Sequence, residues 1–105
     1  NANVRIGGAS MVTGGVRISK DVPPFIVATD NPVRYGGVNE TLLKNSGTDH
    51  KVIGHIANAY RLVFHGQTSV FDAINQIKEQ VPPGKEIDSI VSFLESTQIG
   101  IISKM

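Results

Sequence analysis

The sequence predicts a mixed α/β protein in which the last coil of a parallel β-helix is followed by a C-terminal helical bundle. Hydrophobic residues recur every six positions near the start of the chain, two adjacent prolines end that repeat, and apolar residues then recur every three or four positions. We expect a terminal β-helix coil over residues 1–24, an extended segment and loop over 25–48, and a helical domain over 49–105.

The hexapeptide frame contains two registers of hydrophobic or small residues. The first register comprises Ile6, Val12 and Ile18, and the second comprises Val4, Ser10, Val16 and Val22. These residue types suit a parallel β-helix, because both registers point into a narrow triangular core. Pairs of glycines permit the tight corners of such a coil. The alternative is an ordinary glycine-rich strand and hairpin.

Three hexads make only one coil, which cannot bury its core without stacked neighbours. The sequence therefore predicts that further coils precede it and that the chain is a fragment. It begins at Asn1-Ala2 without an initiator methionine, which suggests that these two residues are a tag remnant. At the other end, Pro23 and Pro24 remove backbone donors, so the repeat stops there.

The residues after the coil combine a short apolar run with turn formers. Phe25 to Ala28 is apolar, and Asp30, Asn31 and Pro32 follow, with two glycines shortly before Val38. We expect one extended segment and then a loop that reaches over a cleft.

Beyond the loop the apolar spacing is helical. A first helix is expected from about Asp49 to His65, capped by Thr48 or Asp49 and ended by Gly66. A second stripe, entered through Thr68 or Ser69 and closed by two prolines and a glycine, consists of Val70, Ile74, Ile77 and Val81. A third stripe consists of Ile87, Ile90, Val91 and Leu94. Three such helices would pack as a small bundle and cover the last edge of the β-helix.

Composition excludes several classes of protein. Ten basic and nine acidic residues give a net charge of +1, so no strong field favours nucleic acid or an anionic membrane. Cysteine is absent, which excludes disulfides and thiolate metal sites. No apolar run approaches the roughly 20 residues of a membrane span. We expect a soluble, cytoplasmic protein with no cofactor, no transmembrane segment and no nucleic-acid partner.

The three histidines do not form a metal site by their spacing. His50 and His55 are five residues apart, so they do not share a helix face as a zinc pair does, and His65 stands at a helix end where a cation is favoured. Structural or solvated roles are expected for all three. Tyr60 and Phe64 belong to the core by their spacing.

Taken in order, four stretches resemble the C-terminal third of the bacterial acyl carrier protein-dependent UDP-N-acetylglucosamine O-acyltransferases of lipid A biosynthesis. They are IGGASMVTGG, DVPPFIVA, GVN and NAYRLVF, and a GII follows near the end. Hexapeptide repeats alone are shared by many acyltransferases. The order of the later motifs discriminates this family from its hexapeptide relatives.

The resemblance implies a left-handed parallel β-helix and a homotrimer. The implied enzyme moves a 3-hydroxyacyl chain from acyl carrier protein to the 3-hydroxyl of the nucleotide sugar, with an active site between subunits. A histidine on an earlier coil would act as general base and backbone donors would stabilise the oxyanion. That coil is not in this sequence, so no catalytic residue is assigned and the fragment alone is expected to be inactive.

The resemblance also implies roles for individual residues. Gly14 matches the glycine at which the family limits acyl-chain length, and its alternative is a corner glycine needed only for backbone geometry. Asn39 matches the asparagine that helps hold the nucleotide, since an amide can donate to and accept from a uracil edge. Its alternative is an ordinary loop or helix-cap asparagine. Thr41 and Asn45 complete the predicted nucleotide-binding set.

Some of these positions depart from the family pattern. Thr41 stands where the family has a glutamate, Asn45 and Ser46 replace two arginines, and Ile99 replaces another. A guanidinium makes bidentate, charge-assisted bonds to phosphate that Asn and Ser cannot replace. A diverged paralogue therefore remains an alternative: a related transferase for another nucleotide sugar, or a non-catalytic module that trimerises or binds the carrier protein.

Overall fold

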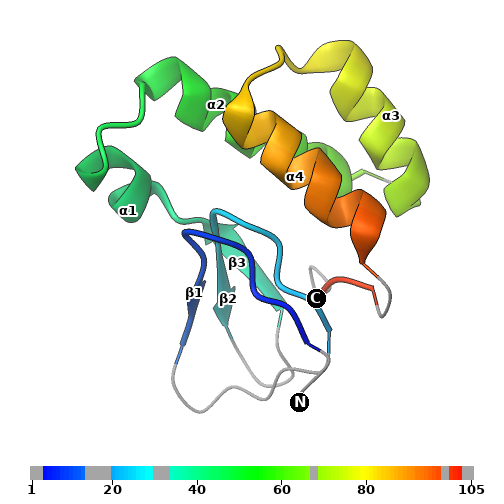
Figure 1. Ribbon diagram of the computed structural model, residues 1–105, viewed down its shortest axis with the longest axis horizontal. Helices are drawn as coiled ribbons and strands as arrows, with labels where there is room; N and C mark the ends of the chain where they lie inside the picture. Colours follow the sequence, from blue (N-terminus) through cyan, green and yellow to red (C-terminus); the bar gives the residue numbers. More distant parts are fainter. Residues whose placement is uncertain (1–3, 14–19, 30–33, 67–68, 98–99, 103–105) are drawn as a thin grey trace.

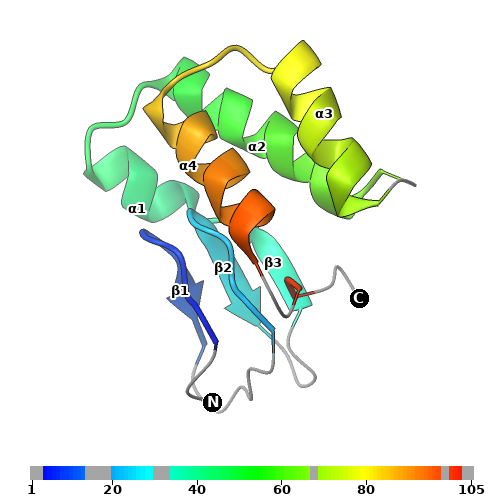
Figure 2. The same cartoon turned by 45° about the vertical axis from the view of Figure 1, so that its right-hand side comes forward.

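The part of the chain that the structure describes contains three short strands followed by four helices, which confirms the mixed α/β class. The computed structural model describes residues 4–13, 20–29, 34–66, 69–97 and 100–102. The elements are β1 (Met11–Val12), β2 (Ile26–Thr29), β3 (Arg34–Val38), α1 (Glu40–Asn45), α2 (His50–Phe64), α3 (Val70–Gln80) and α4 (Lys85–Ser96). The helices gather on one side of the strands, as two views show (Figures 1 and 2).

The start of the chain pairs in parallel with a segment that lies 16 residues later. Met11 of β1 pairs with Val27 of β2, and Ile6 forms an isolated parallel bridge with Val22. Arg5 and Asp21 are separated by the same 16 residues. Three full hexads would return after roughly 18 residues. Ile6 of the first register therefore lies opposite Val22 of the second register.

The third strand runs in the opposite direction to β2 and completes a sheet of order β1-β2-β3. Its register shifts between Ile26 and Ala28, and Gly37 adopts a φ of +115°, which favours glycine. The extended segment expected after the coil is thus two antiparallel strands.

A helix also occupies part of the expected loop. Helix α1 covers Glu40–Asn45 and buries only Leu43, and it ends before Gly47, whose φ is +81°. Six residues are too few to show a helical period, so the spacing gave no sign of this helix. Tertiary contacts stabilise such a short helix, because its own hydrogen bonds cannot offset the cost of nucleation.

The three longer helices lie where the apolar spacing predicts them. Asp49 caps α2 by accepting the N–H of Lys51 at 2.7 Å, and Ser69 caps α3 by accepting the N–H of Asp72 at 3.2 Å. Helix α4 begins directly after Gly84. No helix among the described residues has the length and apolar character needed to cross a bilayer.

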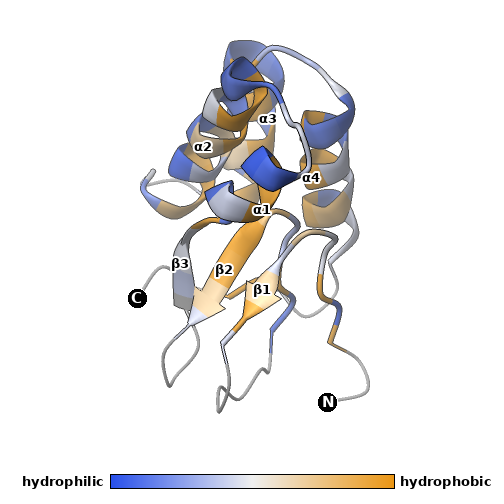
Figure 3. Cartoon of the chain, turned by 90° about the vertical axis from the view of Figure 1, so that its left-hand side faces the viewer, coloured by the Kyte–Doolittle hydropathy of each residue, from blue (hydrophilic) through white to orange (hydrophobic). Residues whose placement is uncertain are grey.

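One continuous core joins the sheet to the helices. The hydrophobic residues lie along β2 and on the helices, where they alternate with hydrophilic ones (Figure 3). Among the described residues, the fully buried hydrophobic side chains include Val22, Ile26, Ala28, Ile56, Ala59, Tyr60, Ala73, Ile77, Ile90 and Ile102. The core therefore lies where the helices cover the sheet.

The C-terminal segment returns to the sheet side of the molecule. Ile101 forms a parallel bridge with Asp21, whose N–H donates to the Gly100 carbonyl at 2.8 Å. The N–H of Ile102 donates to the Asp21 carbonyl at 3.0 Å. Residues 20–22 therefore lie between the N-terminal segment on one side and the C-terminal segment on the other.

Candidate functional site

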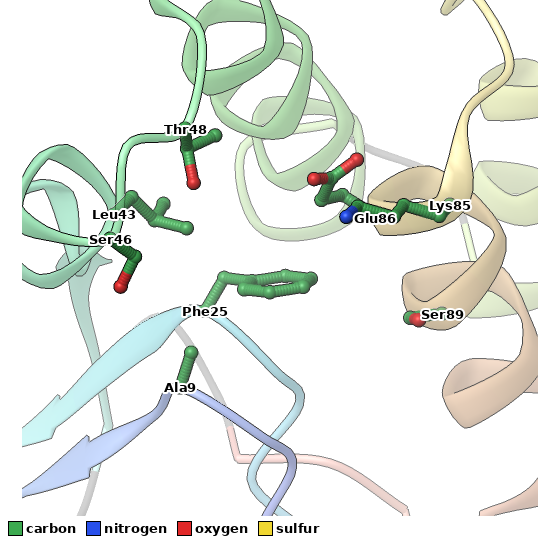
Figure 4. Close-up of a pocket in the computed structure, with 8 residues that line it drawn as sticks. All are labelled: Ala9, Phe25, Leu43, Ser46, Thr48, Lys85, Glu86 and Ser89. Carbon is green, nitrogen blue, oxygen red and sulfur yellow. The ribbon is translucent and has the colours of Figure 1, made fainter.

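A cavity of about 310 Å³ opens between the corner of the sheet and the helices. Phe25 projects into its middle, with residues of the α1–α2 region on one side and residues of α4 on the other (Figure 4). The lining residues are Ala9, Phe25, Leu43, Ser46, Thr48, Lys85, Glu86 and Ser89. The lining combines an aromatic and aliphatic floor with three hydroxyls and a pair of opposite charges.

The floor of the cavity contains two residues with unusual backbone angles. Ala9 and Phe25 have φ values of 59° and 68°, in the left-handed region that favours glycine. Such a conformation costs on the order of 1 kcal/mol per residue and persists only where neighbours hold it. The Phe25 N–H donates to the Gly8 carbonyl at 3.0 Å. This hydrogen bond joins the backbone at Phe25 to the backbone next to Ala9.

Asn39 forms hydrogen bonds with both Ala9 and Phe25. Its backbone N–H donates to the Phe25 carbonyl at 2.7 Å, and its side-chain amide donates to the Ala9 carbonyl at 3.2 Å. Asn39 is 6% exposed and precedes α1 without capping it through its side chain. The structure therefore gives Asn39 a positioning role at the cavity floor, and its contact with a nucleotide stays a prediction.

The other two predicted nucleotide-binding residues lie on the outside of α1. Thr41 and Asn45 are exposed and four residues apart, so they share one helix face. Ser46 follows them, donates its hydroxyl to the Leu42 carbonyl at 2.8 Å and lines the cavity. The structure places this set around one short helix, but Asn39 points toward the sheet while Thr41 and Asn45 remain open to solvent.

Two further positions from the sequence analysis lie outside the described residues. They are Gly14, the predicted acyl-chain ruler, and Ile99, which replaces a family arginine.

The three histidines are spread along and beside α2. His50 and His65 are exposed and His55 is half-buried, and the ring of His65 meets the edge of Tyr35 at 6.1 Å between centroids. Within the described ranges, no three His, Cys, Asp or Glu side chains converge to hold a metal ion.

Tyr60 and Phe64 are core residues, as their spacing predicts. Tyr60 is completely buried and its hydroxyl donates to the Pro24 carbonyl at 2.6 Å. The ring of Phe64 stacks on Tyr35 at 4.1 Å between centroids. Burial, together with the neighbouring Tyr35, raises the pKa of Tyr60 well above its ordinary value, so its hydroxyl stays protonated and donates.

No pattern in the sequence indicates the buried carboxylate of Asp21, which stands there only as the first residue of the stretch DVPPFIVA. Asp21 is 2% exposed and accepts the Arg5 N–H at 2.8 Å and the Thr97 hydroxyl at 2.6 Å. Burial alone would raise the pKa of Asp21, but these hydrogen bonds and the Arg5 guanidinium outweigh it and hold the pKa below its ordinary value. Its partners are 16 and 76 residues away, so no local pattern could reveal them.

The stabilising effect of the Asp21 carboxylate is expected to disappear in acid. Because its pKa is lowered in the folded state, its contribution is fully present above the ordinary pKa of 3.8 and is lost as the pH falls through the folded value. Urea unfolding of the native chain and the Asp21→Asn variant should show a stability difference at pH 7 that shrinks below pH about 4. A difference that stays constant down to pH about 2 would contradict the lowered pKa.

Comparison with known proteins gives one consistent family. The sequence profile of UDP N-acetylglucosamine O-acyltransferase, domain 2, matches residues 21–102. The acyl-[acyl-carrier-protein]–UDP-N-acetylglucosamine O-acyltransferase of Burkholderia mallei is 35% identical over 103 residues, and the Paraburkholderia phymatum protein of the same name is equally similar. Each match covers 94% of this chain but 39% of the relative.

Solved structures agree with the sequence matches. The crystal structure of LpxA, a UDP-N-acetylglucosamine acyltransferase from Bacteroides fragilis, superposes with a TM-score of 0.93 at 38% identity. LpxA from Acinetobacter baumannii superposes with a TM-score of 0.90 at 31% identity. Both matches cover 94% of this chain and 39% of the other, so the chain spans about two fifths of the relatives it matches.

Proposed function

Because this chain belongs to the UDP-N-acetylglucosamine O-acyltransferase domain 2 family, we propose that it is the C-terminal part of an enzyme of lipid A biosynthesis. The proposed enzyme transfers a 3-hydroxyacyl chain from acyl carrier protein to the 3-hydroxyl of UDP-N-acetylglucosamine. The observation that carries the proposal is the match over nearly the whole chain, 35% identical in sequence and superposable in structure.

The proposed fold of the first part is the last coil of a left-handed β-helix, ending near residue 24. The parallel pairing of Ile6 with Val22 and of Met11 with Val27 supports this proposal, because one turn of the chain brings it back beside itself at a constant spacing. In the proposed homotrimer the helical domain from residue 49 onward would cover the end of this coil.

The proposed nucleotide site lies at α1. Thr41 and Asn45 would contact the nucleotide directly, because their side chains share an exposed face of this helix. Asn39 would keep the helix in place through its bonds to the Phe25 and Ala9 carbonyls. Gly14 is proposed as the acyl-chain ruler. The carrier protein would deliver the chain, and no catalytic role is assigned to the three histidines.

Calorimetry on the protein that carries this domain, against UDP- and dTDP-sugars, tests the proposal. UDP-N-acetylglucosamine should bind, and replacing Thr41 and Asn45 by alanine should weaken binding about tenfold through lost hydrogen bonds. Glu79→Gln, on the exposed surface of α3, should leave binding unchanged. Binding of dTDP-sugars alone, or equal affinity in all variants, would contradict the proposal.

A related transferase for another nucleotide sugar is the second candidate. The departure from the family pattern at α1 supports it, because Asn45 and Ser46 stand where the family has arginines and Lys44 is the cation of this helix. Without guanidinium groups this surface offers phosphate fewer charge-assisted bonds. In the same panel, a preference for a different UDP-sugar over UDP-N-acetylglucosamine would support this candidate.

A further inference from the structure

The buried carboxylate of Asp21 joins three segments that are far apart in the sequence. One oxygen, Oδ1, accepts the backbone N–H of Arg5 at 2.8 Å. The other, Oδ2, accepts the hydroxyl of Thr97 at 2.6 Å and lies 3.6 Å from Nε of Arg5. We call these three residues the clasp. A buried carboxylate is tolerated only when its oxygens are satisfied, and both oxygens here are occupied.

Arg5 extends the clasp onto the end of α4. Its Nη2 donates to the Phe93 carbonyl at 3.3 Å and to the Ser96 hydroxyl at 3.0 Å. The guanidinium carbon also lies 4.4 Å from the centre of the Phe93 ring, a cation–π contact. The same arginine therefore contacts the carboxylate, the last turn of α4 and an aromatic face.

The clasp lies where the C-terminal segment pairs with the backbone N–H and carbonyl of Asp21. Residues 100–102 form backbone hydrogen bonds with Asp21, and on its other side the Val22 N–H donates to the Arg5 carbonyl at 2.8 Å. Without residues 100–102, the Asp21 N–H and carbonyl would be left unpaired at an edge. An uncovered edge of this kind can pair with another chain.

We propose that the Asp21 carboxylate is a latch that, through Thr97, holds residues 100–102 of the C-terminal segment against this edge. The segment of residues 100–102 is short, and its described backbone hydrogen bonds are made with Asp21 itself. The side chain of Ile102 belongs to the same hydrophobic core as α2 and α3, but these two helices contribute many more buried side chains to that core. Loss of the carboxylate therefore opens the C-terminal segment locally, and the helical core remains folded. This inference is independent of the proposed enzymatic function.

Amide hydrogen exchange in the Asp21→Asn variant tests the latch. Asparagine keeps the size of the side chain but removes its charge and one of its acceptors. Exchange at Ile102 and at residue 21 should become about tenfold faster or more. Exchange at Tyr60 and Ile77, inside the core, should be unchanged. Unchanged exchange at Ile102 would overturn the proposal, as would equal acceleration at all four amides.

Two further variants complete the experiment. Glu95→Gln makes the same chemical change near the same end of α4, where Glu95 forms an exposed ion pair with Lys78 at 3.2 Å, and it should leave exchange at Ile102 unchanged. Thr97→Val removes one hydrogen bond of the clasp and keeps the shape of the side chain. If Asp21→Asn does not fold, faster exchange at Ile102 in Thr97→Val supports the latch, and unchanged exchange overturns it.

Discussion

Replacing Gly7 by alanine is expected to lower the free energy of unfolding by about 3 kcal/mol or more. A Cβ at this position would lie 2.6 Å from Cα and 2.7 Å from Cδ of Pro24, closer than nonbonded carbons approach. The backbone cannot move away easily, because the Gly7 N–H donates to the Val22 carbonyl at 2.7 Å. The proline cannot yield either, since its ring and backbone are rigid.

Gly8→Ala is the matched control for this experiment. A Cβ on Gly8 would meet nothing within 4 Å, so its effect on the free energy of unfolding should stay within about 0.5 kcal/mol. Urea unfolding followed by circular dichroism measures both variants. Equal stability of Gly7→Ala and Gly8→Ala would show that residues 7 and 24 are not in the close contact described here.

Replacing Tyr60 by phenylalanine is expected to cost about 2 kcal/mol, the cost of leaving a buried carbonyl without a donor. The Tyr60 hydroxyl donates to the Pro24 carbonyl at 2.6 Å, and both residues are buried. The ring remains, so the packing against Tyr35 and Phe64 is kept. The change therefore isolates a single hydrogen bond between α2 and the backbone of Pro24.

Tyr35→Phe provides the comparison, because the Tyr35 hydroxyl makes no hydrogen bond to another described residue and its side chain is half-buried. Its effect should be below about 0.5 kcal/mol in the same unfolding measurement. A cost for Tyr60→Phe no larger than that of Tyr35→Phe would mean that the bond to Pro24 adds nothing to stability.

Both experiments test contacts of Pro24, and the structure shows contacts there that the sequence does not indicate. From the sequence, Pro23 and Pro24 are expected only to stop the hexapeptide repeat. In the structure Gly7 lies against Pro24, Tyr60 donates to its carbonyl, and the Ser10 hydroxyl donates to the Pro23 carbonyl at 2.5 Å. The two prolines therefore join the N-terminal segment to the helical core.

At the candidate site, too, the sequence indicates the residues and the structure determines their surroundings. Family resemblance alone indicates Asn39, Thr41 and Asn45, and the structure gathers them around α1, a helix that the sequence does not predict. Their environments differ. Asn39 is buried beside Ala9 and Phe25, whereas Thr41 and Asn45 are exposed. Left-handed backbone at an alanine and a phenylalanine has no sequence signature, because most such positions hold glycine.

The sequence by itself determined the three long helices, the N-terminal caps of the first two, the order of strands before helices and the family. These features depend on spacing and residue type within one segment, where a period of 3.6 residues or a serine before a helix acts locally. Tertiary structure decided the parallel pairing of segments 16 residues apart, the helix α1 and the clasp of Arg5, Asp21 and Thr97. Each of these depends on contacts between distant segments, which form only when the whole core has assembled.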